Sequence, residues 1–194
     1  DRVEDLMGSQ FALHHIHATR QDPGAGPSRW HQDYEQHPQT NRSHLMVHVF
    51  YYLNGLNGEV GDLLVLPKSH KTVTVRNAFG IFGTEDLPGS LTFDNLAPGT
   101  AIIVHSAVQH ARRAKPGGEN SPRYFIDVSY CQKGVLWPSY RNHAEINKKA
   151  LEMGLDRDGR YDFVYDTNNF YNTREYREIL EHKNQGSLSL QLKD

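Results

Sequence analysis

Short stretches rich in β-branched and aromatic residues, each closed by turn residues, constrain the fold of this chain more than any other feature. We expect these stretches to form strands at residues 10–20, 29–34, 45–53, 62–66, 91–93, 100–105, 108–113 and 123–131. Turns such as Asn54-Gly55, Pro98-Gly99 and Pro116-Gly117-Gly118 separate them. Many short strands with such turns predict a mainly β sandwich or barrel.

The last third of the chain changes character and predicts helices. Asn142 is placed to cap a helix because Glu145 follows three residues later, and Gly154 lies just beyond the expected end. A second helix is expected after Thr173, with an apolar side made of Tyr176, Ile179 and Leu180. We therefore expect residues 1–135 to form the β core and residues 136–194 to form a helical extension packed on that core.

The composition argues against several kinds of partner. The formal net charge is −2 with both signs interspersed, so we expect no nucleic-acid partner. Apolar runs such as residues 101–104 are far shorter than the ~20 residues of a membrane helix, so we expect no membrane span. The single cysteine, Cys131, excludes an internal disulfide and fits a reducing, cytoplasmic location.

The start of the chain is typical of the end of a helix. Residues 1–7 have helical character and Gly8 closes them. We therefore expect the native protein to have further sequence before Asp1, including any targeting segment. The sequence does not indicate an oligomeric state.

The segment Trp30-His31-Gln32-Asp33 contains a His-x-Asp pair suited to hold a metal ion. On an extended strand, side chains two residues apart point to the same face, so His31 and Asp33 can contact one ion while Gln32 points elsewhere. Taken alone, the pair favours a solvated strand end, because chance pairs are common in a chain with 12 histidines. A metal site therefore needs a further ligand from elsewhere in the chain.

That further ligand is available after the apolar strand that follows Pro98-Gly99. His110 completes a set of two imidazoles and one carboxylate, which is the arrangement expected of a non-haem iron(II) oxygenase. His105 competes for this role. The two histidines are an odd number of residues apart, so a regular strand points them to opposite faces. We interpret His105 as a core histidine with a hydrogen-bond partner.

Arg123 is a candidate partner for a dicarboxylate cosubstrate. It opens the strand that we expect to pair antiparallel with the strand of His110. A guanidinium group is a fixed fork that binds a carboxylate in two places. The alternative is a surface arginine, and the strand register, which the sequence does not fix, decides between the two.

These segments resemble the phytanoyl-CoA dioxygenase (PhyH) family of 2-oxoglutarate oxygenases. The matching segments are Pro-x-Arg-Trp-His-Gln-Asp at residues 27–33, Gly-Asp-Leu-Leu-Val-Leu-Pro-Lys-Ser-His-Lys at residues 61–71, and Pro98-Gly99-Thr100 through His110 to Arg123. Their order and spacing agree with the family from about Gly8 to Tyr130. The resemblance implies a double-stranded β-helix, a cupin-like fold also called a jelly roll.

The resemblance also implies roles for individual residues. The implied iron ligands are His31, Asp33 and His110, and the implied partner of the tail carboxylate of 2-oxoglutarate is Arg123. Gln32, His17 and Phe50 are placed near the cosubstrate by the same alignment. One position departs from the family: many members have a small hydroxyl residue two positions after the distal histidine, where this chain has Arg112. This arginine is either a second cationic contact or points outward.

Three neighbouring histidines also suggest a metal cluster at first sight. They are His14, His15 and His17. Adjacent residues on a strand diverge, whereas His15 and His17 share a face. We interpret these two as lining the barrel.

The implied function is an iron(II)- and 2-oxoglutarate-dependent dioxygenase. It is expected to hydroxylate a small organic or acyl-type substrate with release of succinate and CO2, using iron(II), 2-oxoglutarate and O2, with ascorbate as an optional reductant. Asp33 favours hydroxylation over halogenation, because related halogenases have a small residue at this position. The alternative is a metal-binding cupin-type protein, either an isomerase or a non-catalytic binding protein, which needs no Arg123 aimed at the metal.

Overall fold

The computed structural model describes residues 2–38, 40–113, 122–139, 143–155 and 158–173 of the chain. The strands are β1 (Phe11–Gln21), β2 (Ser28–His31), β3 (Met46–Tyr52), β4 (Leu56–Asn57), β5 (Asp62–Val65), β6 (Leu91–Phe93), β7 (Asn95–Leu96), β8 (Thr100–His105), β9 (His110–Arg113), β10 (Arg123–Gln132), β11 (Trp137–Ser139) and β12 (Phe170–Asn172). The helices are α1 (Arg2–Met7) and α2 (His143–Glu152), with 3-10 turns at Ser69–Lys71, Gly80–Phe82, Asp162–Tyr165 and Thr167–Asn169. The predicted mainly β fold is confirmed.

One wall of the molecule is a four-stranded antiparallel sheet with the strand order β1-β10-β3-β8. We call this sheet the large sheet. Residues that are direct partners in the register point to the same face of a sheet. The rows on the face that concerns the site are His15–Ser129–His48, His17–Asp127–Phe50 and Thr19–Phe125–Tyr52. Each row therefore places three side chains together on that face.

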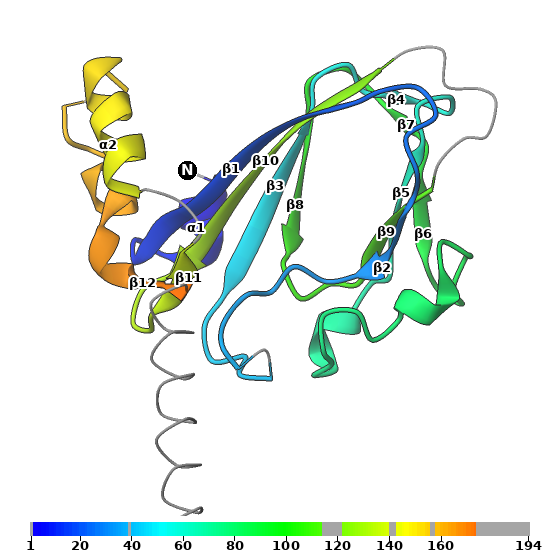
Figure 1. The fold of residues 1–194 in the computed structure, drawn as a ribbon, viewed down its shortest axis with the longest axis horizontal. Helices are drawn as coiled ribbons and strands as arrows, with labels where there is room; N and C mark the ends of the chain where they lie inside the picture. Colours follow the sequence, from blue (N-terminus) through cyan, green and yellow to red (C-terminus); the bar gives the residue numbers. More distant parts are fainter. Residues whose placement is uncertain (1, 39, 114–121, 140–142, 156–157, 174–194) are drawn as a thin grey trace, which may run out of the picture.

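The opposite wall is a second antiparallel sheet with the order β2-β9-β5-β6. In it, His110 of β9 is the register partner of His31 on one side and of Val65 on the other. The two sheets face each other as the walls of a double-stranded β-helix, or jelly roll (Figure 1). This is the predicted architecture.

The predicted pairing between the strands of His110 and Arg123 is wrong. β10 pairs with β1 and β3, whereas β9 pairs with β2 and β5. Strands that follow one another form a hairpin only when both stay in the same sheet, and here the chain crosses from one sheet to the other. His110 and Arg123 therefore lie on opposite walls of the barrel.

Strand β5 shows how the inner and outer layers of the core are built. Successive side chains of a strand point to opposite faces. Leu63 packs inside the barrel with Phe50, whereas Leu64 packs on the other face with Trp30 and Ala111. Because β5 is buried on both faces, Leu63, Leu64 and Val65 follow Asp62 as a continuous apolar run rather than an alternating one.

A shift in the register of β1 divides that strand into two parts. The pairing with β10 is irregular between Leu13 and His15. Leu13 and His15 therefore point to opposite faces of the sheet, although they are two residues apart. Phe11 and Leu13 pack outward, while His15 and His17 lie in the rows of the inner face. This single irregularity allows one strand to hold both the C-terminal cover and a polar group inside the barrel.

The described C-terminal part packs on the outer side of β1. Val164 and Ile146 join the cluster around Phe11 and Leu13, and Figure 1 shows α2 outside the large sheet. α2 ends just before Gly154, as predicted. Its predicted cap and the predicted helix after Thr173 lie outside the described residues. Among the described residues, no helix combines the length and the apolar character needed to cross a bilayer.

We expect Leu64→Ala to lower the free energy of unfolding by about 2–5 kcal/mol, because it opens a cavity among side chains that cannot fully collapse. Leu64 is 0% exposed, whereas Leu91 on the paired strand β6 is 51% exposed. Leu91→Ala is therefore the matched control and should change the free energy by about 0.5 kcal/mol or less. Urea denaturation measures both, and equal effects would contradict the packing described here.

Candidate metal centre

The pairing of β2 with β9 brings the predicted metal ligands together. His31 ends β2, His110 begins β9, and the two are register partners. Direct partners in an antiparallel pair have Cβ atoms about 5 Å apart. Asp33 lies two residues beyond His31, where its N–H donates to the carbonyl of Ser106 at 2.7 Å. Backbone contacts therefore position all three residues before any ion is considered.

The three side chains converge on one point. Nε2 of His110 lies 3.1 Å from Oδ2 of Asp33, and Nε2 of His31 lies 3.6 Å from Oδ1. One ligand atom from each residue lies within 4.8 Å of the other two. Two imidazole nitrogens and one carboxylate oxygen form a set that leaves positions open on a six-coordinate metal ion.

Hydrogen bonds to backbone carbonyls orient both imidazoles. Nδ1 of His31 donates to the carbonyl of Arg29 at 2.6 Å, and Nδ1 of His110 donates to the carbonyl of Val108 at 3.1 Å. A carbonyl can only accept, so the proton of a neutral ring sits on Nδ1 and the lone pair sits on Nε2. In the neutral form of each ring the Nε2 lone pair therefore points toward Asp33, which is the tautomer a metal ligand needs.

The charges of the site favour a carboxylate at Asp33. Burial raises the pKa of Asp33, but the neighbouring imidazoles, His110 foremost, outweigh burial and hold that pKa well below its usual range. The carboxylate in turn raises the pKa of His110 against the effect of that ring's burial. Burial and His110 lower the pKa of His31. At neutral pH the site thus offers an anion and a neutral imidazole.

Arg76 contacts the same carboxylate from the segment that follows β5. Its guanidinium donates to Oδ1 of Asp33 at 3.1 Å. Its backbone carbonyl accepts a hydrogen bond from the N–H of Gln32 at 3.0 Å. The segment is therefore attached to the site both by its backbone and by a side chain.

The three residues line a cavity of about 160 Å³ between the two sheets. Its lining comes from the triad and from Gln21, Ser28, Phe50, Tyr52, Leu63, Ala111, Arg112, Arg123 and Phe125. Arg123 is only 4% exposed, and its guanidinium donates to the hydroxyl of Tyr52 at 3.2 Å. It faces the cavity from the wall opposite β9 and is not a surface arginine.

Arg112 lies in the same lining but has different partners. Its guanidinium donates to the carbonyls of Ala25 at 3.1 Å and Gly26 at 2.7 Å. It therefore holds the turn between β1 and β2 and does not point outward into solvent. Arg112 and Arg123 are both part of the lining of the cavity.

The residues placed near the cosubstrate by family resemblance divide into two groups. Phe50 lines the cavity. Among the described lining residues neither His17 nor Gln32 is present. The side-chain carbonyl of Gln32 accepts from the N–H of Tyr34 at 2.9 Å, and its amide donates to the carbonyl of Thr74 at 3.3 Å. Gln32 is thus placed as a brace between the ligand segment and the Arg76 segment.

His105 lies apart from the triad, at the end of β8 in the other sheet. Its Nδ1 accepts a hydrogen bond from the N–H of Ala107 at 3.0 Å, and its ring stacks on Tyr34 and His70. Burial lowers the pKa of His105 to about 4. This agrees with the interpretation of His105 as a neutral core histidine.

Several residues beside the site were not identified from the sequence. Asp127, Tyr52 and His48 lie on the inner face of the large sheet, and Arg76 reaches in from its loop. The even spacing of Asp127 from Arg123 on one strand was a signal for a shared face. No comparable local signal marks Arg76, because its contact depends on how a loop folds back.

Comparison with known proteins places the chain in a family. A model of the phytanoyl-CoA dioxygenase (PhyH) family matches residues 1–115, and the chain belongs to this family. It is 31% identical over 71 residues to the probable alpha-ketoglutarate-dependent hypophosphite dioxygenase of Stutzerimonas stutzeri. That match covers 37% of this chain and 24% of the relative, so the chain spans well under half of the relative's length.

Solved structures share the fold at lower identity. EvdO2 from Micromonospora carbonacea var. aurantiaca, complexed with 2-oxoglutarate, has a TM-score of 0.52 and 21% identity over 68% of this chain and 58% of its own. HygX from Streptomyces hygroscopicus, with nickel and 2-oxoglutarate bound, has a TM-score of 0.54 and 15% identity over 71% of this chain and 65% of its own. These similarities support the jelly-roll fold.

We expect Gln32→Leu to lower the free energy of unfolding by about 1–3 kcal/mol, because it leaves the buried N–H of Tyr34 without its acceptor. Gln10 is exposed at the surface, so Gln10→Leu is the control and should have little effect. Chemical denaturation compares the two variants. A Gln32→Leu protein as stable as the wild type would argue against the brace and leave a cosubstrate role open.

Proposed function

We propose that this chain forms the core of an iron(II)- and 2-oxoglutarate-dependent dioxygenase. In this proposal His31, Asp33 and His110 hold iron(II), and Arg123 binds the far carboxylate of 2-oxoglutarate. The observation that carries the proposal is that the triad and the guanidinium of Arg123 line one cavity from opposite walls. Membership of the PhyH family supports the same assignment.

The donor set of the triad fits iron(II). Both imidazoles present Nε2, since each Nδ1 is bonded to a backbone carbonyl, and Asp33 stays ionised beside them. Two imidazoles and one carboxylate bind one face of an octahedral ion and leave three positions for cosubstrate, oxygen and water. The protein therefore supplies the ligand atoms without rearranging its strands, and because Asp33 raises the pKa of His110, the ion competes with a proton for that ring.

The rest of the cavity fits a short dicarboxylate. Arg123 offers a fork of N–H donors at the wall opposite the triad, and the hydroxyl of Tyr52 holds that fork in place. Phe50, Leu63 and Phe125 give the cavity apolar sides against which methylene groups can pack. These side chains also keep water away from the reacting end.

Iron(II) bound with 2-oxoglutarate and O2 supplies the oxidising power for hydroxylation of a C–H bond, with release of succinate and CO2. The carboxylate of Asp33 is itself the third protein ligand, and its presence favours hydroxylation over halogenation. The proposed substrate class is a small organic or acyl-type molecule. The role of the chain is to hold the metal and the cosubstrate in fixed positions and to shield them from solvent.

The alternative function, a cupin-type metal protein that does not use 2-oxoglutarate, predicts a different cavity. Such a protein has no use for a buried guanidinium facing the metal ligands across a small cavity. The 4% exposure of Arg123 and its place in the lining favour the oxygenase.

We expect the full chain, kept anaerobic, to develop the weak visible charge-transfer band of an iron(II) chelate when iron(II) and 2-oxoglutarate are both added. Asp33→Ala should abolish the band, because it removes the anionic ligand. Asp22→Ala, which changes an exposed aspartate in the turn after β1, is the control and should retain it. A band of full intensity in Asp33→Ala would contradict the assignment of Asp33 as a metal ligand.

We expect Arg123→Leu to weaken 2-oxoglutarate binding about 10–100-fold, since a hydrogen bond to a charged group contributes roughly 1.5–3 kcal/mol. Titrating 2-oxoglutarate against the iron(II)-loaded protein and following the same band gives the dissociation constant. Arg20→Leu removes an arginine whose side chain is 61% exposed, and it should leave the constant unchanged. Equal constants for the Arg123 variant and the wild type would contradict the proposal.

A further inference from the structure

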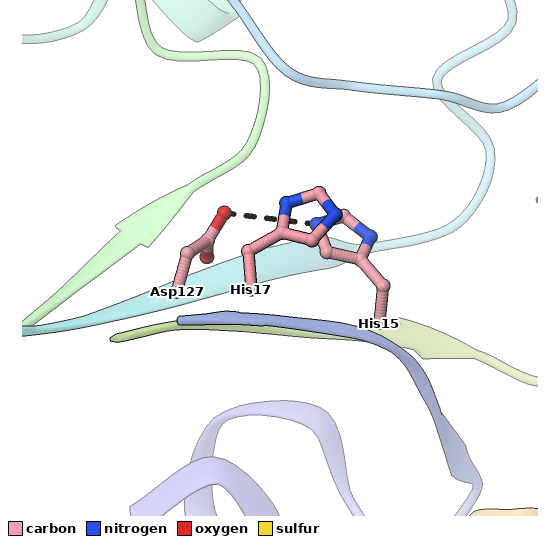
Figure 2. Close-up of side chains that lie close together, drawn as sticks. All are labelled: His15, His17 and Asp127. Carbon is pink, nitrogen blue, oxygen red and sulfur yellow. Dashed lines mark ion pairs between the residues drawn. The ribbon is translucent and has the colours of Figure 1, made fainter. Parts of the chain in front are cut away.

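A second group of metal-type ligands lies on the inner face of the large sheet. His15 and His17 come from β1 and Asp127 from β10, and Figure 2 shows the three side chains on the same side of the strands. His17 and Asp127 are direct register partners, and His15 is two residues along the same strand. One ligand atom of each lies within 4.8 Å of the other two.

This group is separate from the triad. Phe50 is the register partner of Asp127, and the centroid of its ring lies 5.7 Å from that of His110 and 5.8 Å from that of His48. Among the described residues that line the cavity of the triad, none belongs to the second group. An ion held by the second group is therefore a different ion.

Hydrogen bonds hold the ring of His15 from its Nδ1 side. Nε2 of His14 contacts the carbonyl of Pro138 at 2.9 Å and must donate to it. Nδ1 of His15 lies 2.7 Å from Nδ1 of His14, so one proton lies between these two nitrogens. In the tautomer in which His15 supplies that proton, its Nε2 carries a lone pair.

The oxygen that faces this lone pair is also an acceptor. Nδ1 of His48 donates to Oδ1 of Asp127 at 2.8 Å. The same nitrogen of His48 lies 3.0 Å from Oδ2, so it contacts both oxygens of the carboxyl group. Oδ2 of Asp127 lies 3.6 Å from Nε2 of His15. In the tautomer with the lone pair on Nε2 of His15, these two atoms are both acceptors, and a cation between them satisfies both.

We infer that His15, His17 and Asp127 form a second site for a divalent cation of the zinc type. Zinc takes imidazole nitrogens and carboxylate oxygens at about 2.0–2.2 Å in a tetrahedron, which sets its ligand atoms about 3.3–3.5 Å apart. The 3.6 Å between His15 and Asp127 is close to this spacing. Because His17 is exposed, water can reach the fourth position.

Hydrogen bonds from neighbouring side chains hold two of the proposed ligands, as is common in zinc sites. A ligand histidine commonly donates its other N–H to a fixed acceptor, and ligand carboxylates are themselves hydrogen-bonded. His14 and the hydroxyl of Ser129, 2.9 Å away, fix the ring of His15, and His48 fixes Asp127. β1 is the edge strand of its sheet, so an ion here joins that strand to β10 and stabilises the folded state.

Zinc binding to the full chain tests the inference with no need for catalysis. Equilibrium dialysis and metal analysis should find two equivalents of zinc in the wild type, because the triad also binds zinc. Asp127→Asn and His17→Ala should each lose one equivalent and keep one, and Asp33→Ala should lose the other. Asp22→Asn, the matched exposed aspartate, should keep both.

A second measurement guards against a misfolded variant. In the Asp33→Ala protein, where only the second site remains, zinc should raise Tm above its value with a chelator, and Asp127→Asn added to it should remove that difference while the protein still unfolds cooperatively. The inference fails if Asp33→Ala binds no zinc, or if Asp127→Asn retains two equivalents. If instead Asp33→Ala retains both equivalents and Asp127→Asn loses one, the iron proposal fails and the second site stands.

Discussion

The pairing of His31 with His110 across β2 and β9 is the contact on which the rest of the site depends. It fixes the two imidazoles side by side, and the chain after β2 then has only two residues in which to bring Asp33 to the same point. The carbonyls of Arg29 and Val108 are available to orient the rings because they belong to the same two segments. A slip of one residue in this pairing would turn a ligand to the other face and remove the site.

The sequence predicts what is local and misses what depends on distant pairing. The strands and the His31–Asp33 spacing could be predicted, because turn residues and alternation act over a few residues. The sheet to which β10 belongs could not be predicted, because the placement of β10 depends on the chain crossing from one sheet to the other after β9. The bracing role of Gln32 could not either, because its partner Thr74 is far away in the chain.

The inner faces of the two sheets share the polar chemistry of the barrel. The sheet β2-β9-β5-β6 and the segment after β2 contribute the triad, and the sheet β1-β10-β3-β8 contributes Arg123 and Asp127, four residues apart on β10. Two opposite charges on one inward-facing strand remain stable because each has its own partners, Tyr52 for the cation and His48 for the anion. Phe125 lies between Arg123 and Asp127 on the same face of β10.

The contact between Arg76 and Asp33 has a thermodynamic consequence for the loop that carries it. A metal ion at the triad and the guanidinium of Arg76 both interact with the carboxylate of Asp33. Binding of the ion therefore alters the free energy of the contact between Arg76 and Asp33. Such coupling is reciprocal: if the ion loosens the loop by some factor, anything that restrains the loop elsewhere changes ion affinity by that same factor. If the triad holds iron(II) as proposed, the conformation of the segment that carries Arg76 and the affinity for the ion are thermodynamically coupled through Asp33.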